Sequence, residues 1–441
     1  MRRPLQGRGG IVATLATPER IRELQRALYL RAKREPRFRA YALYDKLYRP
    51  DILAHAYALA KANGGAPGPD GVSFEEIEAT GREALLEELS EELKAKTYRP
   101  GPVRRVYIPK LNGGERPLGI PNIRDRVVQT AVKLLLEPLF EADFEADSYG
   151  FRPKRAAHDA LDAIQEALQK GMCWVIDADI AAYFDTIPHD RLMKTVATRV
   201  VDGSMLALVK RMLEAPIIDE RDGGRPRRPR QGTPQGGVIS PLLANIYLHL
   251  VDRNFRRNAE RGTLQGRLIR YADDLVLLAR HRPDREFAWL RQLLERLGLT
   301  LQPAKTRVVD ARREDFTFLG HRHRWRFERL YLDISPKALR RIRDELRRKT
   351  RRTWLGLSAM VADLSLYIRG ARHYFRRVRR KTLSNLDRFV DQRLARWWAR
   401  KHSRRRPAWS LVYGGALHRQ CGLALWNLPA ALRPADARYA R

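Results

Sequence analysis

The segment Leu268-Ile269-Arg270-Tyr271-Ala272-Asp273-Asp274-Leu275-Val276-Leu277-Leu278 places two adjacent carboxylates between two mostly apolar runs. β-Branched and aliphatic residues favour strands, and Asp is common in turns because its side chain bonds nearby backbone groups. The pattern predicts a β-hairpin with Asp273 and Asp274 at its tip. Such a tip is half of a divalent-cation site, since a metal-assisted reaction on phosphates needs further carboxylate oxygens. An ordinary hairpin with an acidic turn is the alternative that this segment alone leaves open.

A second acidic strand end supplies the missing carboxylate. Residues 174–180 read as a buried strand that ends in Asp177-Ala178-Asp179. If this strand lies beside the hairpin, Asp179, Asp273 and Asp274 form a three-carboxylate cluster, whose mutual repulsion would be relieved by cations such as Mg²⁺. Two such ions could support an in-line phosphoryl displacement. Asp177 would face the same side as Asp179, but it lies deeper in the apolar run, which favours a structural role.

The charge of the chain indicates a polyanionic partner. Its 441 residues leave room for about three domains, and 44% hydrophobic residues suffice for real cores. The net charge is +35, and residues 337–441 hold 28 Lys and Arg against 6 Asp and Glu, a net +22. A general preference for Arg would not concentrate charge at one end, so we expect binding to nucleic acid.

The two cysteines, Cys173 and Cys421, are far apart in the sequence. They exclude a four-cysteine zinc module and give no disulfide framework, which fits a reducing compartment. Residues 1–20 contain no apolar signal-peptide core, and no run of about twenty apolar residues predicts a membrane span. We therefore expect a cytoplasmic protein associated with nucleic acid and not with membranes.

Local signals predict a mixed α/β region followed by basic helices. Ser73 and Glu76 have the spacing of a capping box at the start of a helix over 73–95. Ser240 is the expected N-cap of a helix over 240–254, with Pro241 at its first position. A hairpin is predicted from strands 103–110 and 115–120, and amphipathic helices over 336–352, 357–379 and 382–402.

From about residue 44 to 402 the chain resembles the reverse transcriptases of group II introns. The motifs that carry the resemblance occur in the family's order, and together they are far more specific than any one alone. They are Tyr107-Ile108-Pro109-Lys110 with Arg116-Pro117-Leu118-Gly119-Ile120-Pro121, Tyr149-Gly150-Phe151-Arg152-Pro153, Asp179 with Phe184 and Asp185, Gly232-Thr233-Pro234-Gln235-Gly236, Ser240-Pro241-Leu242-Leu243-Ala244-Asn245, Tyr271-Ala272-Asp273-Asp274, Lys305-Thr306, and Phe318-Leu319-Gly320.

The resemblance implies an α/β fold of the right-hand polymerase type, with an antiparallel palm sheet. Fingers and palm would occupy residues 44–335 after a basic lead-in at 1–43. A helical thumb and maturase domain would cover 336–403, before a basic, irregular tail at 404–441. Many relatives continue into a zinc-containing endonuclease with paired cysteines, and we expect that segment to be lacking here.

The resemblance also implies roles for single residues. Asp179, Ile180, Asp273 and Asp274 would hold two Mg²⁺ ions, for which Mn²⁺ could substitute, and the three aspartates would be catalytic. The residues expected to bind the nucleotide are Lys110, Arg116, Phe184, Gln235 and Lys305, where Phe184 would exclude a 2′-hydroxyl and Lys305 would neutralise or protonate the leaving group. The residues expected at the primer and template are Tyr271, Pro234, Gly236, Phe318, Leu319 and Gly320.

Several of these residues also have ordinary structural interpretations. Lys110 and Lys305 could be solvated surface charges, and Phe184 could be core. Residues 149–153 could be only a structural loop. These alternatives stay open at the level of the sequence.

Basic residues and aromatics alternate in the C-terminal helices, a pattern suited to RNA phosphates and unpaired bases. Most of the aromatics should nevertheless be helix-packing core, and Trp397 and Trp398 are about 100° apart, so only one of them is expected to face RNA. The predicted RNA-binding residues are Arg369, Arg372, Arg376, Arg396, Trp397, Arg400 and Lys401.

The expected function is RNA-directed DNA synthesis together with binding of group II intron RNA, assisting its splicing and mobility. The expected partners are template and intron RNA, a DNA primer or target and dNTPs, and a homodimer stays open. One alternative is a domesticated relative, for instance in a CRISPR adaptation system, without an intron of its own. Another is a splicing factor whose polymerase site is inactive, against which the intact Asp179, Asp273 and Asp274 argue.

Overall fold

The computed structural model describes residues 15–109, 114–326, 329–403, 406 and 422–426 of the chain. It divides into two compact units, Met1–Val308 and Val309–Arg441. The division falls inside a strand, β7 (Arg307–Asp310). The domain boundaries expected from the sequence, including the one at residue 336, stay proposals.

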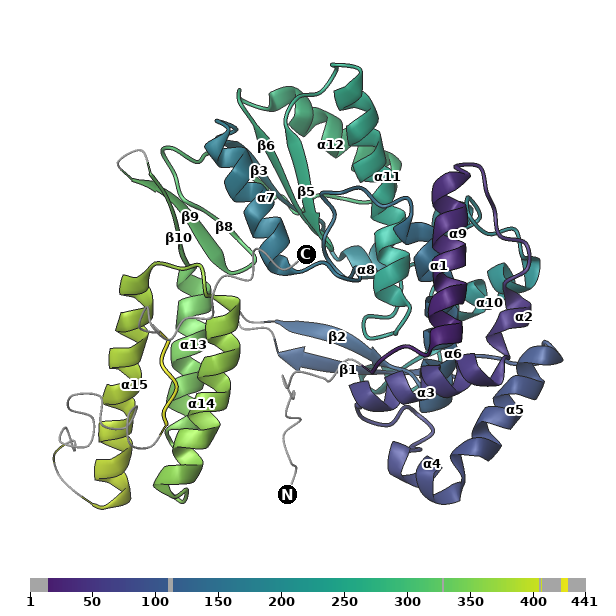
Figure 1. Cartoon of the computed structure of the whole chain (residues 1–441), viewed down its shortest axis with the longest axis horizontal. Coiled ribbons are helices and arrows are strands. Elements are labelled where there is room, and N and C mark those ends of the chain that lie inside the picture. The colour runs from purple at the N-terminus through teal and green to yellow at the C-terminus, as the bar shows by residue number, and fades with distance from the viewer. Residues whose placement is uncertain (1–14, 110–113, 327–328, 404–405, 407–421, 427–441) are drawn as a thin grey trace. The chain divides into compact units, whose positions relative to one another are not determined.

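The first unit contains two sheets and most of the helices (Figure 1). Its helices are α1 (Glu19–Arg34), α2 (Tyr44–Leu47), α3 (Pro50–Asn63), α4 (Phe74–Thr80), α5 (Arg82–Lys94), α6 (Ile123–Glu141), α7 (Ala157–Gln169), α8 (Tyr183–Thr186), α9 (His189–Val196), α10 (Gly203–Leu213), the 3₁₀ turn η1 (Glu220–Asp222), α11 (Ser240–Glu260) and α12 (Asp284–Arg296). Its strands besides β7 are β1 (Val103–Pro109), β2 (Glu115–Ile120), β3 (Trp174–Asp179), β4 (Ile217–Asp219), β5 (Arg267–Tyr271) and β6 (Asp274–Ala279).

The larger sheet has the order β5-β6-β3-β7 and confirms the predicted antiparallel palm. β5 and β6 pair antiparallel and meet at Tyr271 opposite Asp274, so the predicted acidic hairpin forms. β3 pairs antiparallel with β6 on its other side. Helix α7 packs against β5 and β6 (Figure 1), and the central strand residues Val175, Ile176 and Leu278 are fully buried. A rigid, buried sheet therefore carries the acidic tip.

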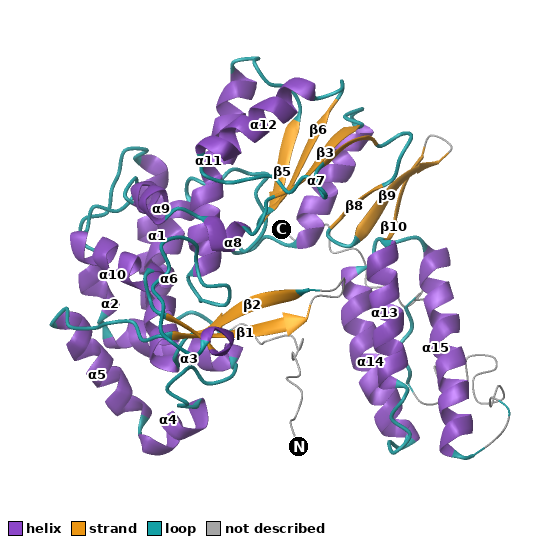
Figure 2. Cartoon of the chain, turned by 180° about the vertical axis from the view of Figure 1, so that it is seen from behind, coloured by secondary structure: helices purple, strands orange, loops and turns teal. Residues whose placement is uncertain are grey.

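The smaller sheet has the order β2-β1-β4, and Figure 2 shows β1 and β2 side by side. β1 and β2 form the predicted antiparallel hairpin, with Ile108 opposite Arg116. β4 adds a short parallel pairing to β1. The hairpin brings Arg116 onto its returning strand, while Lys110, expected beside it, lies outside the described residues.

Two local predictions about helices need correction. Ser73 and Glu76 form the expected capping box, but the helix predicted over 73–95 is two helices, because Gly81 at φ 115° separates α4 from α5. Ser240 is not the N-cap of α11 but its first residue, and Ile239 stands at the cap. The Ser240 hydroxyl instead donates to the Pro234 carbonyl at 2.9 Å, closing the loop before the helix.

The second unit is a three-stranded antiparallel sheet followed by three helices (Figure 1). The strands are β8 (Phe316–Phe318), β9 (His321–Arg326) and β10 (Arg329–Ile334), and the helices are α13 (Pro336–Lys349), α14 (Leu357–Tyr374) and α15 (Arg380–Lys401). Ser335 caps α13 by accepting the amide of Ala338 at 3.2 Å. Leu346, Leu364 and Trp397 belong to a core of their own, so the three predicted helices pack as a bundle.

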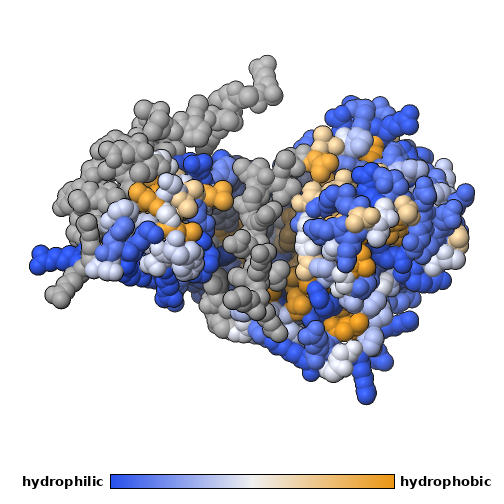
Figure 3. All heavy atoms as spheres, turned by 90° about the horizontal axis from the view of Figure 1, so that it is seen from below, coloured by the Kyte–Doolittle hydropathy of each residue, from blue (hydrophilic) through white to orange (hydrophobic). Residues whose placement is uncertain are grey.

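Among the residues coloured by hydropathy in Figure 3, hydrophilic ones predominate, and the apolar ones occur in scattered groups. None of the helices in the described residues is both long enough and apolar enough to span a bilayer.

We expect the second unit to lose stability in acid because of His323. This residue is 1% exposed, stacks on Phe316, and neither ring nitrogen has a hydrogen-bond partner among the described residues. Burial, and next the neighbouring His321, lowers the pKa of His323 to about 3. In the unfolded chain the His323 ring takes up a proton below about pH 6.5, whereas in the folded chain it stays neutral. The free energy of unfolding is therefore full above that pH and falls as the pH drops, by about 2 kcal/mol at pH 5.

Denaturant unfolding of the full chain at pH 7 and pH 5 measures this loss. His323→Phe should be less acid-sensitive than the wild type by that amount, and His281→Phe, at an exposed position, should match the wild type. Equal acid sensitivity of His323→Phe and wild type would refute the assignment.

Candidate active site

Adjacent strands bring the three predicted carboxylates to one end of the palm sheet. Asp179 at the end of β3 lies directly opposite Asp274 at the start of β6. Asp273 precedes Asp274 in the hairpin turn, after Ala272 in the left-handed region at φ 56°. Asp177 lies two residues back on β3, where Arg307 Nε is 3.4 Å from its carboxylate. The candidate cluster is therefore Asp179, Asp273 and Asp274, with Asp177 already paired.

The pKa values of these carboxyls report their crowding. Burial raises the pKa of Asp273, and the negative charge of Asp179 raises it further. The positive charges of Arg116 and Lys305 act in the opposite direction. Asp274 keeps some exposed surface, but the protein around it removes much of its hydration. This loss of hydration, and next the negative charges of Asp273, Asp179 and Asp177, raise the pKa of Asp274 to about 7. Like charges held together in this way favour a bound cation.

The donor set fits a divalent cation that shares its coordination with substrate. Among the described residues no three His, Cys, Asp or Glu side chains already form a metal cage. Mg²⁺ characteristically takes only one or two carboxylates and completes its shell with phosphate oxygens and water. In this structure the counter-charge to Asp179 is the Lys305 ammonium, whose Nζ donates to Asp179 Oδ2 at 2.8 Å. The Lys305 side chain is 63% exposed, so little packing holds its ammonium in this position.

A buried arginine supports the hairpin from within. Arg270 is 0% exposed and forms an ion pair with Asp252 of α11 at 2.6 Å. Its Nη2 also donates to Ser148 Oγ at 2.6 Å, and its Nη1 donates to Asn245 Oδ1 at 2.7 Å and to the Ala272 carbonyl beside the acidic tip at 2.9 Å. Neither Arg270 nor Asp252 was among the predicted site residues, although a lone charged residue inside an apolar strand is a usable signal.

Gly150 lies directly beneath the acidic tip. A Cβ atom at Gly150 would lie 2.2 Å from the Ala272 amide nitrogen, closer than any real contact. The neighbouring Tyr149 amide donates to the Arg270 carbonyl, and Asn245 Nδ2 donates to the Gly150 carbonyl at 2.7 Å. Tyr149 and Gly150 therefore pack against the acidic hairpin and restrict the position of its turn.

Gly150→Ala is expected to lower nucleotide incorporation at least about tenfold, because the added methyl group must push the Ala272 backbone, and a displacement of about 1 Å is enough for such losses. Primer-extension kinetics would measure it. Gly203→Ala, where a Cβ meets nothing within 4 Å, is the matched control and should keep full activity. Wild-type kinetics in Gly150→Ala would show that the tip tolerates the shift.

The loop 232–236 connects the fingers hairpin to the palm. Gln235 accepts from Arg116 Nε at 3.0 Å and donates through Nε2 to Asp185 Oδ2 at 3.1 Å. Its carbonyl accepts the Gly119 amide at 2.5 Å. Gly236, at φ 111°, approaches the Gly119 carbonyl so closely that a Cβ would be 2.4 Å from it. Two predicted nucleotide residues, Arg116 and Gln235, are thus in contact, and Asp185 fixes the orientation of the Gln235 amide.

Phe184 lies five residues after Asp179, in the short helix α8. Its side chain is 8% exposed and packs edge-on against Tyr183. The Phe184 carbonyl accepts the Thr233 amide at 2.6 Å, which joins α8 to the Gln235 loop. Ile180, also predicted at the metal site, has a buried side chain and forms an isolated bridge with Leu301.

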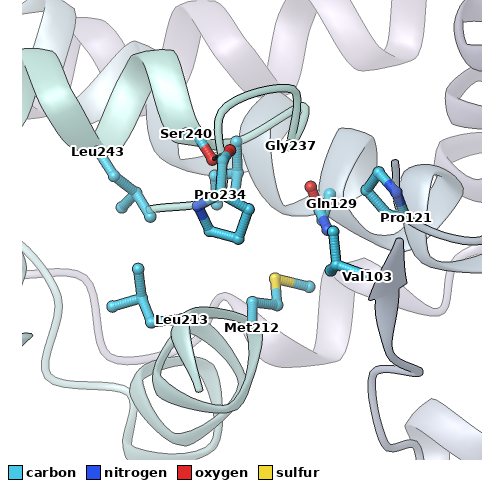
Figure 4. Close-up of a pocket in the computed structure, with 10 residues that line it drawn as sticks. Val103, Pro121, Gln129, Met212, Leu213, Pro234, Gly237, Ser240 and Leu243 are labelled. Carbon is cyan, nitrogen blue, oxygen red and sulfur yellow. Dashed lines mark hydrogen bonds between the residues drawn. The ribbon is translucent and has the colours of Figure 1, made fainter. Parts of the chain in front are cut away.

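The enclosed cavity nearest this loop is too small for a substrate. It measures about 10 Å³ and lies between Val103, Met212, Pro234 and Leu243 (Figure 4). That volume holds about one water molecule. This cavity therefore has no room for a nucleotide.

The predicted RNA-binding residues of the second unit differ in exposure and in hydrogen bonding. Arg369, Arg376, Arg396 and Arg400 are exposed. Arg372, Arg400 and Lys401 each donate to a backbone carbonyl. The prediction for Trp397 was wrong, since its side chain is 0% exposed and its Nε1 donates to the Arg352 carbonyl at 3.0 Å in the bundle core. Phe318, Leu319 and Gly320 also belong to the second unit, and their role at the primer end stays a prediction.

Two family models match the chain. Residues 108–323 match reverse transcriptase (RNA-dependent DNA polymerase), and residues 339–413 match the group II intron maturase-specific domain. Protein YkfC of Escherichia coli K12 is 38% identical over 342 residues, which cover 68% of this chain and 88% of YkfC.

The chain belongs to the group II intron reverse transcriptase and maturase family. It is thus a reverse transcriptase followed by a maturase-specific domain, and the family prediction from the motifs is confirmed. These two domains imply binding of RNA, including intron RNA, and the use of divalent metal ions.

Other relatives are longer than the shared region. The group II intron-encoded protein LtrA of Lactococcus lactis subsp. cremoris is 39% identical over 212 residues, covering 48% of this chain and 34% of LtrA. The 91 kDa protein in the cob intron of Schizosaccharomyces pombe is 28% identical over 339 residues, covering 63% of this chain and 40% of that protein. A chain of a partial Cas6-RT-Cas1–Cas2 complex aligns over 58% of this chain and 40% of its own, with 23% identity and a TM-score of 0.34.

Proposed function

We propose that Asp179, Asp273 and Asp274 form the polymerisation centre and hold two Mg²⁺ ions during DNA synthesis on an RNA template. The observation that carries this proposal is the register of the palm sheet, in which Asp179 lies opposite Asp274 with Asp273 beside it. Ile180, whose side chain offers no ligand, would contribute its carbonyl oxygen. When bound, Mg²⁺ lowers the pKa of the attacking 3′-hydroxyl and neutralises charge on the leaving pyrophosphate.

The reaction requires a dNTP and a primer. The primer 3′-oxygen bonds to the α-phosphorus, the bond from that phosphorus to the bridging oxygen breaks, and pyrophosphate leaves as the hydroxyl proton is lost. Arg116 would hold the triphosphate through its guanidinium fork, with Lys110 as a second positive charge. Lys305, released from Asp179, would neutralise or protonate the pyrophosphate.

Gln235 would sit beside the incoming nucleotide and the template. Its side chain is held between Arg116 and Asp185, which supports a fixed position at the junction of fingers and palm. Tyr271 of the acidic hairpin, together with Pro234 and Gly236 of the Gln235 loop, would contact the primer and template. Phe184 would lie under the deoxyribose and exclude a 2′-hydroxyl.

Incorporation of dTTP on poly(rA)/oligo(dT) tests the polymerase. The purified chain should extend the primer in Mg²⁺, with Mn²⁺ as a substitute, and stop when EDTA is added. No extension with either ion would contradict the proposal.

We also propose that the second unit binds group II intron RNA in the cytoplasm and assists its splicing. The exposed Arg369, Arg376, Arg396 and Arg400 would neutralise RNA phosphates. Splicing of a group II intron at low Mg²⁺ should depend on added protein, and binding should weaken steeply with salt. Splicing that is equally fast without protein would count against this role. Light scattering of the free protein would test the homodimer.

A further inference from the structure

Phe151 is exposed in a strained backbone conformation. Its side chain is 52% exposed although phenylalanine is usually buried. Its φ is 56°, in the left-handed region that bulky residues rarely adopt. Strain of this kind persists only where the surroundings impose it, and it concentrates at functional sites. Two further non-glycine residues of the same site, Ala182 and Ala272, share this backbone region.

The residues on both sides of Phe151 are firmly held. Gly150 packs against the Ala272 backbone beside the acidic tip. Arg152 is buried, donates to the carbonyls of Glu145 and Ser148 at 2.6 Å each, and pairs with Glu141 at 2.7 Å. The backbone therefore presents Phe151 at a fixed position beside the catalytic hairpin.

The Phe151 ring meets the ring of Phe184. The two centroids are 6.5 Å apart and the planes are inclined at 80°, an edge-to-face contact. Phe184 itself is 8% exposed, so most of the accessible surface of this aromatic pair belongs to Phe151. A sugar that approaches Phe184 would therefore meet Phe151 as well.

We propose that Phe151 is a specificity-determining residue, which together with Phe184 forms the wall that excludes a ribonucleotide 2′-hydroxyl. The inference rests on the proposed function, because it takes Phe184 as the residue beneath the incoming sugar. Phe151 limits the space on the open side of Phe184 and holds its ring in place. To select against a single hydroxyl group, the surface that faces the sugar must be rigid. The edge-to-face contact between Phe151 and Phe184 restricts the movement of both rings.

The test compares the catalytic efficiency kcat/KM for dTTP and UTP on poly(rA)/oligo(dT). Phe151→Ala should lower the preference for dTTP about tenfold or more, a size typical for a change of pocket shape. Phe151→Leu keeps part of the side-chain bulk, so its preference for dTTP should lie between those of the wild type and Phe151→Ala. It provides the test if the alanine variant does not fold. Tyr41→Ala, which removes another exposed aromatic of the first unit, should keep the wild-type preference.

Phe184→Ala separates this inference from the proposed function. If it lowers the preference for dTTP while the folded Phe151 variants keep it, the inference is overturned and the gate at Phe184 stands. If the Phe151 variants lower it and Phe184→Ala does not, the role of Phe184 is overturned, and with it the inference that the two rings form one wall. If Phe151→Ala slows dTTP and UTP equally, Phe151 has a structural role only, and the inference fails.

Discussion

Asparagine in place of Asp273 is expected to reduce RNA-templated DNA synthesis by about 10²–10³-fold, the loss found when one essential electrostatic partner of a transition state is removed. The variant should fold as well as the wild type, because burial and the charge of Asp179 already raise the pKa of Asp273, so that a neutral side chain relieves repulsion. Primer extension on poly(rA)/oligo(dT) measures the activity, and thermal unfolding without metal checks the fold.

Asp177→Asn is the matched control, since Asp177 lies on the same strand and pairs with Arg307. It should keep activity within about tenfold, as expected for a residue that does not contact the reacting atoms. Synthesis that survives Asp273→Asn would refute the proposed centre. An equally severe loss in Asp177→Asn would instead make Asp177 a fourth member of it.

The parts of the site that could be predicted are those with a local signal. The hairpin 268–278 and the strand 174–180 were readable because apolar residues run up to an acidic end in both. That the two strands are neighbours was a condition of the prediction, and the register that sets Asp179 opposite Asp274 is seen only in the structure. The family resemblance then ordered the remaining motifs.

Contacts between distant segments could not be read in this way. Arg270 bonds Asp252, 18 residues away, and Ser148, 122 residues away, and only the topology brings them together. Trp397 was a different kind of error, because the sequence did contain the signal. The buried face of α15 contains residues three and four positions apart, namely Leu386, Val390 and Leu394. Trp397 continues this spacing, which predicts that it is buried as well.

Arg270→Met is expected to lower the free energy of unfolding by about 3–5 kcal/mol, because it leaves the buried Asp252 carboxylate without its partner. Asn245, Ser148 and the Ala272 carbonyl each lose a donor as well. Denaturant unfolding measures the loss. Arg256→Met is the control on the same helix as Asp252. The Arg256 side chain is 49% exposed and pairs with Glu145, and because surface ion pairs contribute at most about 1 kcal/mol, the loss should not exceed that.

The double variant Arg270→Met/Asp252→Leu separates stability from activity. Replacing a buried ion pair by apolar side chains of similar size is often neutral, so this variant should recover most of the lost stability. It cannot restore the donor to the Ala272 carbonyl, which fixes the strained turn before Asp273. We therefore expect a well-folded protein whose primer extension stays at least about tenfold slow, since the carboxylates no longer keep their register to within about 1 Å. Full activity in a stable double variant would mean that Arg270 stabilises the palm without positioning its acidic tip.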